Sequence, residues 1–304
     1  FSFIYMQKTK ILSRILELFN TGENIIQYLK LLNKSKFVTS EDILISYDFQ
    51  AGTYSKRADI NRKIRDGYCQ NLAKNINDLG VFDSILEVGV GEASTLGNLL
   101  LKLKVTPSNI FGFDLSWSRI KYANIFIEPL FPKDKYNIKL TTGDLFNAPF
   151  KDNSLDIVYT SHTLEPNGGL EKEALESLYR ITNKYLILLE PSYELASKVA
   201  KDRMEKHGYV SGLYQTAINL GYNVIKYELF KPTFNDDNPT GIIIIKKDSI
   251  ETPCNFLACP VTKTKLINYR GAYYSEESLL AYPIVDHIPC LLPENAIIAS
   301  HFMK

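Results

Sequence analysis

The feature that most constrains the fold is a short run in which an apolar strand pattern leads into two closely spaced glycines. Residues 85–92 read ILEVGVGE, so Gly89 and Gly91 stand one residue apart at the end of an apolar run. Glycine removes the side chain where a backbone bends sharply or passes close to a ligand. Ser94 or Thr95 is suited to cap a helix that follows. Such a strand, turn and helix is typical of a nucleotide site, although two glycines also fit an ordinary tight turn.

Two further apolar runs also end in acids. The runs NIFGFD and IKLTTGD end at Asp114 and Asp144. Because the carboxyl ends of parallel strands meet at one edge of a sheet, we expect Glu87, Asp114 and Asp144 to lie along that edge. A carboxylate after the second strand binds both ribose hydroxyls, which suits NAD as well as S-adenosylmethionine. Ser94 stands where the dinucleotide fingerprint has its third glycine, which weakens the NAD alternative without excluding it.

With these residues the chain resembles the class I S-adenosylmethionine-dependent methyltransferases, and in particular the group that methylates small molecules. The elements of that group read E-x-G-x-G, then D, then G-D-x-x-x-x-P-F, then S-x-D-x-V, and all occur here in this order between residues 83 and 247. The resemblance implies S-adenosyl-L-methionine as cofactor. It implies that Glu87, Gly89 and Gly91 line the methionine and ribose part, that Asp114 binds the ribose diol, and that Asp144 and Leu145 contact the adenine.

The alternation of apolar runs predicts an α/β fold with a Rossmann-like, mostly parallel sheet. Strands are expected near 84–89, 109–114, 137–142, 155–160 and 184–190, and helices near 94–104, 116–127, 171–182 and 193–220. This alternation is typical of parallel strands joined by right-handed crossovers. Only a polar loop separates the last two runs, 223–230 and 241–247, so these strands form an antiparallel hairpin. The methyltransferase resemblance likewise implies a reversed strand in the sheet.

Three parts are expected along the chain. They are an N-terminal helical cap with its connecting segment (1–58), the methyltransferase domain (59–248) and a small C-terminal module (249–304). Helical spacing over 11–32, broken at Thr21 and Gly22, predicts two N-terminal helices, and a further helix is expected over about 59–79. Residues 47–54 have no clear period. They form either a structured linker or a segment that folds over the cofactor, as in related methyltransferases.

The C-terminal module has its own resemblance. Its start, C-P-V-T, and its ending, Y-P-I-V-D-H-I-P-C-L-L-P, resemble the zinc-ribbon-like activator proteins that accompany several RNA and release-factor methyltransferases. Those proteins carry C-P-x-C and a second C-x-x-C, whereas here Thr262 replaces the second cysteine and the second pair is absent. Tetrahedral zinc needs four close ligands, and the spacing of Cys254, Cys259, His287 and Cys290 fits no ribbon. We therefore expect a metal-free, β-rich module docked on the methyltransferase domain.

The loops after the fourth and fifth strands should face the transferable methyl group. His162 is predicted to be a catalytic base for a hydroxyl acceptor, because its unperturbed pKa lies near neutrality. Glu190 is predicted as a second catalytic group, and Glu165 orients His162 or binds the acceptor. Tyr193 and Asn238 are predicted to bind substrate. Alternatively, His162 only shapes the pocket, and an amine acceptor that arrives neutral needs no base.

Composition limits the partners. Lys plus Arg number 35 and Asp plus Glu number 34, so the net charge of +1 makes a nucleic-acid partner unfavourable. Four scattered cysteines indicate a reducing cytoplasm rather than a disulfide framework. No apolar run reaches the roughly 18 residues of a membrane span. We predict a methyltransferase for a small hydroxylated or amino-bearing metabolite, with a sugar or sugar nucleotide favoured. The alternatives are an RNA or protein methyltransferase and a non-catalytic cofactor-binding scaffold.

Overall fold

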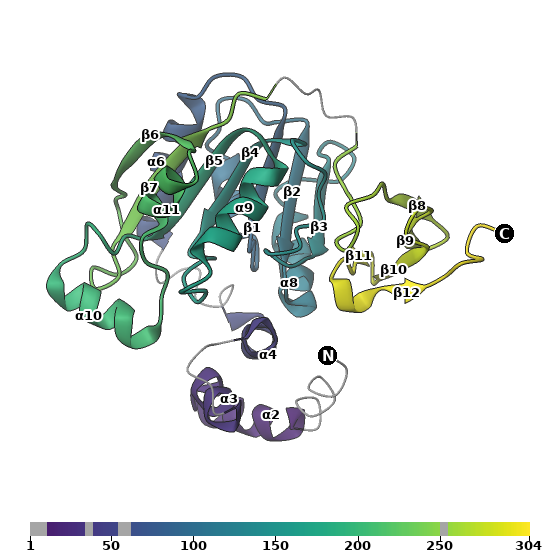
Figure 1. The fold of residues 1–304 in the computed structure, drawn as a ribbon, viewed down its shortest axis with the longest axis horizontal. Coiled ribbons are helices and arrows are strands. Elements are labelled where there is room, and N and C mark those ends of the chain that lie inside the picture. The colour runs from purple at the N-terminus through teal and green to yellow at the C-terminus, as the bar shows by residue number, and fades with distance from the viewer. Residues whose placement is uncertain (1–10, 34–38, 54–61, 250–254) are drawn as a thin grey trace.

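A central seven-stranded sheet organises the computed structural model, which describes residues 11–33, 39–53, 62–249 and 255–304 (Figure 1). The strands are β1 (Ser84–Val88), β2 (Asn109–Asp114), β3 (Ile138–Thr142), β4 (Leu155–Ser161), β5 (Thr182–Pro191), β6 (Asn223–Leu229) and β7 (Thr240–Lys246). Their order is β3-β2-β1-β4-β5-β7-β6. Strands β1 to β5 pair in parallel, and β7 pairs antiparallel with both β5 and β6. The predicted Rossmann-like sheet with a reversed strand is confirmed.

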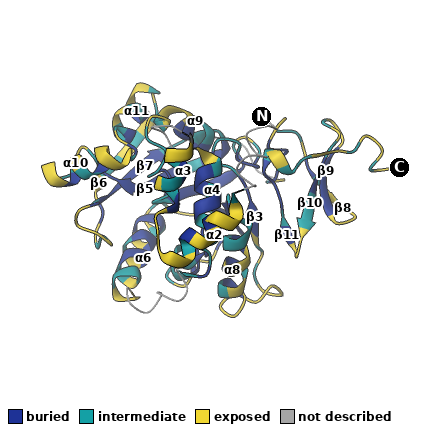
Figure 2. Cartoon of the chain, turned by 90° about the horizontal axis from the view of Figure 1, so that it is seen from below, coloured by how far each residue is buried: buried dark blue, intermediate teal, exposed yellow. Residues whose placement is uncertain are grey.

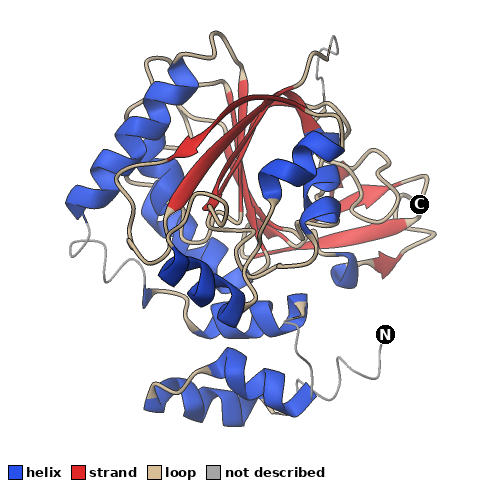
Figure 3. Cartoon of the chain, turned by 60° about the vertical axis from the view of Figure 1, so that its left-hand side comes forward, coloured by secondary structure: helices blue, strands red, loops and turns tan. Residues whose placement is uncertain are grey.

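Helices cover both faces of this sheet (Figure 3). They are α6 (Arg62–Asn77), α7 (Ser94–Leu100) and α8 (Trp117–Ile127) on one face, and α9 (Glu171–Ile181) and α11 (Leu213–Asn219) on the other. Because both faces are covered, β1 is buried at every position, including the polar residues Ser84 and Glu87. The helical stretch expected over 193–220 divides into α10 (Lys198–His207) and α11.

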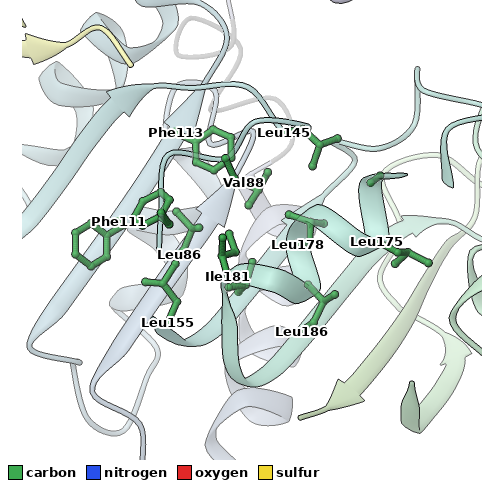
Figure 4. Close-up of a cluster of buried hydrophobic side chains, with 14 of the residues drawn as sticks. Leu86, Val88, Phe111, Phe113, Leu145, Leu155, Leu175, Leu178, Ile181 and Leu186 are labelled. Carbon is green, nitrogen blue, oxygen red and sulfur yellow. The ribbon is translucent and has the colours of Figure 1, made fainter. Parts of the chain in front are cut away.

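Helix α9 illustrates how the core is built. Leu175, Leu178 and Ile181 lie at helical spacing and are fully buried against the sheet (Figure 4). They pack over side chains such as Leu86 and Leu155, which point from the strands toward the helix. Burial of each such side chain contributes about 1.5–3 kcal/mol. The strand ends that carry polar residues are therefore held by a rigid core.

Three helices precede the sheet: α2 (Leu12–Thr21), α3 (Ile25–Asn33) and α4 (Ser40–Phe49). The break between α2 and α3 lies at Gly22, whose φ of 77° ends α2 in the left-handed region, as expected from the sequence. Helix α4 was not expected. It begins at a capping box in which Thr39 and Asp42 bond reciprocally. The first residues of the helix expected from 59, residues 59–61, lie outside the described residues, as do Tyr54 and Cys254.

The C-terminal module is a small antiparallel sheet beside β3 (Figure 1). Its strands are β8 (Ile267–Tyr269), β9 (Ala272–Ser275), β10 (Leu280–Val285), β11 (Ile288–Pro289) and β12 (Ile297–Ile298). Buried Leu257, Tyr282 and Leu291 belong to the same hydrophobic cluster as Phe111 and Phe150 of the central domain. The module is β-rich as predicted, and its core is continuous with the main one. Within the described parts of the chain, no helix is long and apolar enough to cross a membrane.

Candidate active site

A cavity opens at the carboxyl ends of β1, β2 and β4, where the strand order reverses between β1 and β4. Open α/β sheets bind ligands at this position. The cavity encloses about 1100 Å³ of empty space, part of it continuous with solvent. The residues that border it are Ser40, Ile43 and Tyr47, then 87–92, 94 and 95, then 113–115 and 119, then 143–146, and last 161–163, 166 and 167. All six residues predicted to bind the cofactor border this cavity.

The two glycines of the first turn have left-handed backbone conformations. Gly89 has φ of 65° and Gly91 has φ of 54°. A Cβ atom at Gly89 would overlap the side chain of Thr163, whose hydroxyl donates a hydrogen bond to the Val88 carbonyl at 2.8 Å. Gly89 therefore allows a close approach, as its sequence context indicated. The neighbour that comes close is a side chain of the loop after β4.

Asp114 lies beside this turn and is suited to bind a diol. One carboxylate oxygen accepts the Gly91 amide at 3.0 Å, and the other accepts the Ser116 amide at 2.9 Å. Each carboxylate oxygen has two lone pairs, so both oxygens keep one for a ligand hydroxyl. Burial raises the pKa of Asp114, while the charge of Arg119 and the two amides oppose that rise. The carboxylate is thus oriented by the backbone and faces the cavity.

Asp144 and Leu145 form a second wall of the cavity, apart from Asp114 and the glycine turn. Asp144 accepts the Phe146 amide at 3.2 Å and the Asn147 side-chain amide at 2.7 Å, again with one bond to each oxygen. Leu145 is buried, and Phe113 and Phe146 border the cavity beside it. A carboxylate next to an apolar wall suits a flat heteroaromatic ring that carries an amino group. The adenine role of Asp144 and Leu145 stays a prediction.

Glu87 is a buried acid on the cavity wall. It is 2% exposed, and one of its oxygens accepts the Tyr159 hydroxyl at 3.0 Å. Burial raises the pKa of Glu87 to about 8, although the hydrogen bonds from Tyr159 and the Leu96 backbone oppose this. Burial therefore favours the protonated form of the side chain. A protonated Glu87 has an O–H to donate, which a carboxylate lacks.

His162 borders the cavity and has both ring nitrogens engaged. Nδ1 lies 2.9 Å from Glu165 Oε2, and Nε2 lies 2.8 Å from Thr240 Oγ1. Burial alone would lower the pKa of His162, but the hydrogen bond with Glu165 and the charges of Glu190 and Glu165 outweigh it and raise the pKa. The pKa of Glu165 is lowered despite its burial, chiefly by the bond to His162. Neutral His162 therefore carries its proton on Nδ1, and Nε2 accepts from Thr240.

Four other predicted site residues do not border the cavity. Glu190 is 3% exposed and accepts the amides of Thr163 and Leu164 at 3.0 and 3.1 Å, and burial raises its pKa to about 7. Asn238 donates to Glu165 Oε2 at 3.1 Å. The Tyr193 hydroxyl donates to Glu205, away from the cavity. Glu190, Glu165 and Asn238 thus fix the loop that carries His162, and their predicted roles in chemistry stay predictions.

Helix α4 supplies cavity residues that the sequence did not indicate. Ser40, Ile43 and Tyr47 border the cavity, and the Arg119 guanidinium lies 4.5 Å from the centre of the Tyr47 ring. Asp48 accepts the hydroxyl of Ser116 at 2.6 Å, beside the Asp114 site. Tyr47 places the start of the segment 47–54 at the cavity, and its folding over the cofactor stays a prediction. Nothing local marks Tyr47, since its partner is 72 positions away in the sequence.

The cysteines of the C-terminal module do not converge on a metal site. Within the described ranges, no group of three or more His, Cys, Asp or Glu side chains is placed to hold a metal ion. The Cys259 sulfur instead lies 3.2 Å from the Tyr282 hydroxyl and 3.7 Å from the Ser278 hydroxyl, and it accepts the Thr262 amide at 3.5 Å. Cys254 lies outside the described residues. The metal-free state of the module stays a prediction.

Comparison with known proteins identifies a family for the central part of the chain. Residues 82–243, more than half of the 304-residue chain, match the model of a family described as a methyltransferase domain. No curated protein sequence matches the chain.

Solved structures share the fold. The chain is similar to magnesium protoporphyrin IX methyltransferase from Synechocystis PCC 6803 with bound S-adenosylhomocysteine, at 15% identity over 67% of this chain and 98% of that one, with a TM-score of 0.50. It is also similar to a chain from the complex of the Haloferax volcanii Trm112 methyltransferase activator with a methyltransferase (14% identity, 66% and 97% covered, TM-score 0.49). A third is geranyl diphosphate C-methyltransferase from Streptomyces coelicolor A3(2) (11% identity, 58% and 76% covered, TM-score 0.44).

Proposed function

The chain belongs to the methyltransferase domain family, and we propose that it transfers a methyl group to a hydroxyl or amino group of a small molecule. It is an S-adenosyl-L-methionine-dependent methyltransferase. The observation that carries the acceptor proposal is the continuity of one cavity. The cavity extends from Asp114 and Asp144, which suit the nucleoside, to Ser161 and His162 at the end of β4. A small acceptor that enters beside His162 therefore reaches the same space as the cofactor.

The cavity residues fit the adenosyl cofactor. Asp114 has a free lone pair on each oxygen, Asp144 stands beside the apolar wall of Leu145, and the Gly89 turn leaves the backbone exposed to the cavity. The cofactor supplies an electrophilic methyl group on a sulfonium and leaves as S-adenosylhomocysteine. The protein's own contribution is to hold the acceptor atom in line, and such positioning is worth about 7–11 kcal/mol.

The acceptor class rests on chemistry near His162. A hydroxyl must lose its proton as its oxygen attacks, and Nε2 of His162, which faces the Thr240 hydroxyl, is the basic nitrogen of the neutral ring. Thr240 now donates to this nitrogen, so a hydroxyl acceptor takes the place of Thr240 or passes its proton through it. The similar structures are named for a protoporphyrin and for geranyl diphosphate. A sugar acceptor stays a prediction, and Asn238, which is predicted to bind substrate, donates its side-chain amide to Glu165.

Release of S-adenosylhomocysteine tests the proposed activity. Purified protein is incubated with S-adenosylmethionine and a small-metabolite extract, and we expect product only when the extract is present. Product formed only with a nuclease-sensitive or protein fraction would favour an RNA or protein methyltransferase, against which the net charge of +1 stands. Tight cofactor binding without product in any extract would favour the scaffold alternative.

Asp114→Ala tests the cofactor assignment. A hydrogen bond to a charged group contributes about 1.5–3 kcal/mol, so S-adenosylhomocysteine affinity should fall by roughly 10-fold to 150-fold. Calorimetry on the folded variant measures this fall. Unchanged affinity would contradict the ribose role, and tighter binding of NAD than of S-adenosylmethionine would contradict the cofactor assignment.

His162→Asn tests whether His162 acts as the general base for a hydroxyl acceptor. Turnover should fall by about 10²-fold to 10⁴-fold while cofactor affinity is nearly unchanged, because a general base contributes on that scale. Since the pKa of His162 is raised, the imidazolium persists above pH 6.5. The wild-type rate should therefore fall as the pH drops through this raised pKa, where the base becomes protonated. Loss of cofactor binding would make His162 a residue that shapes the pocket, and full activity would indicate an amine acceptor.

We also propose that the C-terminal module is a degenerate relative of the zinc-ribbon-like activators. Its ending and its five short antiparallel strands support this relation. Cys69, Cys259 and Cys290 carry free, buried thiols, which supports a reducing compartment such as the cytoplasm.

A further inference from the structure

The loop between β3 and β4 carries the adenine-side wall of the cavity. Residues 143–146 border the cavity, and the chain then runs through 147–154 before β4 begins at Leu155. Helix α9 holds the middle of this loop, because Ser177 donates to the Leu145 carbonyl at 2.6 Å and Arg180 donates to the Ala148 carbonyl at 2.8 Å. The two ends of the loop are held by another part of the chain.

The first end is paired with the C-terminal module. Thr142, the last residue of β3, forms a parallel bridge with Cys290, which directly follows β11. Cys290 is 8% exposed, so this contact is shielded from water. The next residues along the chain are Gly143 and Asp144. The module therefore extends the sheet edge at the point where the cofactor loop begins.

The second end is also paired with the module. The Ala258 amide donates to the Pro149 carbonyl at 3.0 Å, and the Lys151 amide donates to the Phe256 carbonyl at 2.9 Å. An antiparallel bridge joins Phe150 to Leu257 between these two bonds. The ring of Phe256 lies 4.8 Å from that of Phe111 on the neighbouring strand β2. Backbone pairing and an aromatic contact thus hold the point where the loop ends.

From these two contacts we infer that the C-terminal module is a positioning element of the cofactor site, which sets the conformation of the loop 143–149. The inference rests on the proposed function, because it assigns the adenine contacts to this loop. The module itself touches no part of the cavity within the described residues. Its effect passes through the loop backbone. Because coupling is reciprocal, a module that stabilises the binding conformation is itself stabilised when the cofactor binds.

A pair of matched variants separates this role from general stability. Phe256→Ala removes the ring at the second end of the loop. Phe302→Ala makes the same change on the other side of the module, where the centre of the Phe302 ring lies 5.1 Å from that of Tyr274. In the full-length protein, we expect Phe256→Ala to weaken S-adenosylhomocysteine binding by at least about fivefold, the lower end of ordinary coupling. Phe302→Ala should leave the affinity at the wild-type value.

Hydrogen exchange of the wild-type protein gives a second readout that needs no variant. Saturating S-adenosylhomocysteine should slow exchange of the amides at 256–258 as well as those at 143–151, although 256–258 lie outside the cavity. Protection confined to 143–151, or equal affinity of a folded Phe256→Ala variant, would overturn the inference. Equal weakening by both variants would also overturn it, because that indicates general loosening. A wild-type protein that binds no S-adenosylhomocysteine would overturn the proposed function itself and the inference with it.

Discussion

The two ends of the chain both lie beside the cofactor cavity, but they are attached to the central domain in different ways. The N-terminal helices α2, α3 and α4 have their own small hydrophobic cluster, formed by Ile15, Ile25, Leu29 and Ile45. Asp48 of α4 accepts the Ser116 hydroxyl of the central domain, and just after α4 the Gly52 amide donates to Glu92 at 2.9 Å. Viewed from below, α2 and α3 expose much of their surface, whereas α4 is largely buried (Figure 2).

The C-terminal module instead shares the main core. Leu291 is fully buried in the cluster that also contains Phe111 and Phe150, and backbone pairing joins the module to the edge of β3. The hydrophobic cluster of the N-terminal helices is formed, among the described residues, by residues 11–49 alone, so it is separate from the core that the module shares. We therefore expect the module to unfold together with the central domain, and the N-terminal helices, whose hydrophobic cluster is separate, to unfold more independently. We call the N-terminal helices α2 to α4 the cover and the C-terminal module the support.

The largest expected effect follows from the shared core. Leu291→Ala removes a fully buried side chain from the module, so the free energy of unfolding should fall by about 2–5 kcal/mol. Chemical denaturation should still show one transition, because the module and the central domain unfold together. Ile298→Ala is the control, since Ile298 is 85% exposed in the same module. Two separate transitions, with only the smaller one shifted, would show that the module is an independent unit.

A smaller and more local effect is expected at the cover. Asp48 accepts the hydroxyls of Ser116 and Ser118, at 2.6 and 3.0 Å, and the Ser118 amide at 3.2 Å. Hydrogen bonds to a charged group contribute about 1.5–3 kcal/mol, so Asp48→Ala should reduce the population of docked α4 by roughly 10-fold to 150-fold. Hydrogen exchange in α4 should accelerate and S-adenosylhomocysteine should dissociate faster.

The control for this variant is Glu23→Ala, which removes the same charge from an exposed position in the turn between α2 and α3. The melting temperature of the central domain should change little in either variant, because the N-terminal cluster is separate from the main core. If Asp48→Ala lowers that melting temperature as much as Leu291→Ala does, the distinction between cover and support fails.

The same contrast explains which parts of the molecule the sequence could predict. The strand ends at Glu87, Asp114 and Asp144 were found because burial on both faces leaves continuous apolar runs, and parallel topology then places the ends together. Helix α4 was missed because one of its sides faces the cavity and another packs on α2 and α3, so its apolar residues follow no simple period. Asp42 and Ser46 are buried on it despite being polar.

The site residues divide in the same way. Residues at strand ends that face the cavity were placed from local pattern, whereas partners distant in sequence were not. Thr240 lies 78 positions from His162 and gave no local indication of its bond to the imidazole. Glu190 was expected to face the acceptor because it stands near the end of β5, but its carboxylate turns to the amides of Thr163 and Leu164. Only the packed structure decides which way such a side chain points.

The smallest expected effect is that of metal removal on stability. It tests whether hydrophobic packing alone stabilises the C-terminal module. A structural zinc site contributes about 10–16 kcal/mol to folding, so a strong chelator unfolds a domain that depends on one. In the module, Cys259 bonds to the hydroxyls of Tyr282 and Ser278, and Leu266 and Tyr282 bury it within the main core. We therefore expect the denaturation midpoint to be the same with and without chelator, and metal analysis of the purified protein to find no zinc. Near-stoichiometric zinc, lost together with stability on chelation, would contradict this expectation. Such a result would mean that a bound metal, and not the hydrophobic core shared with the central domain, stabilises the module.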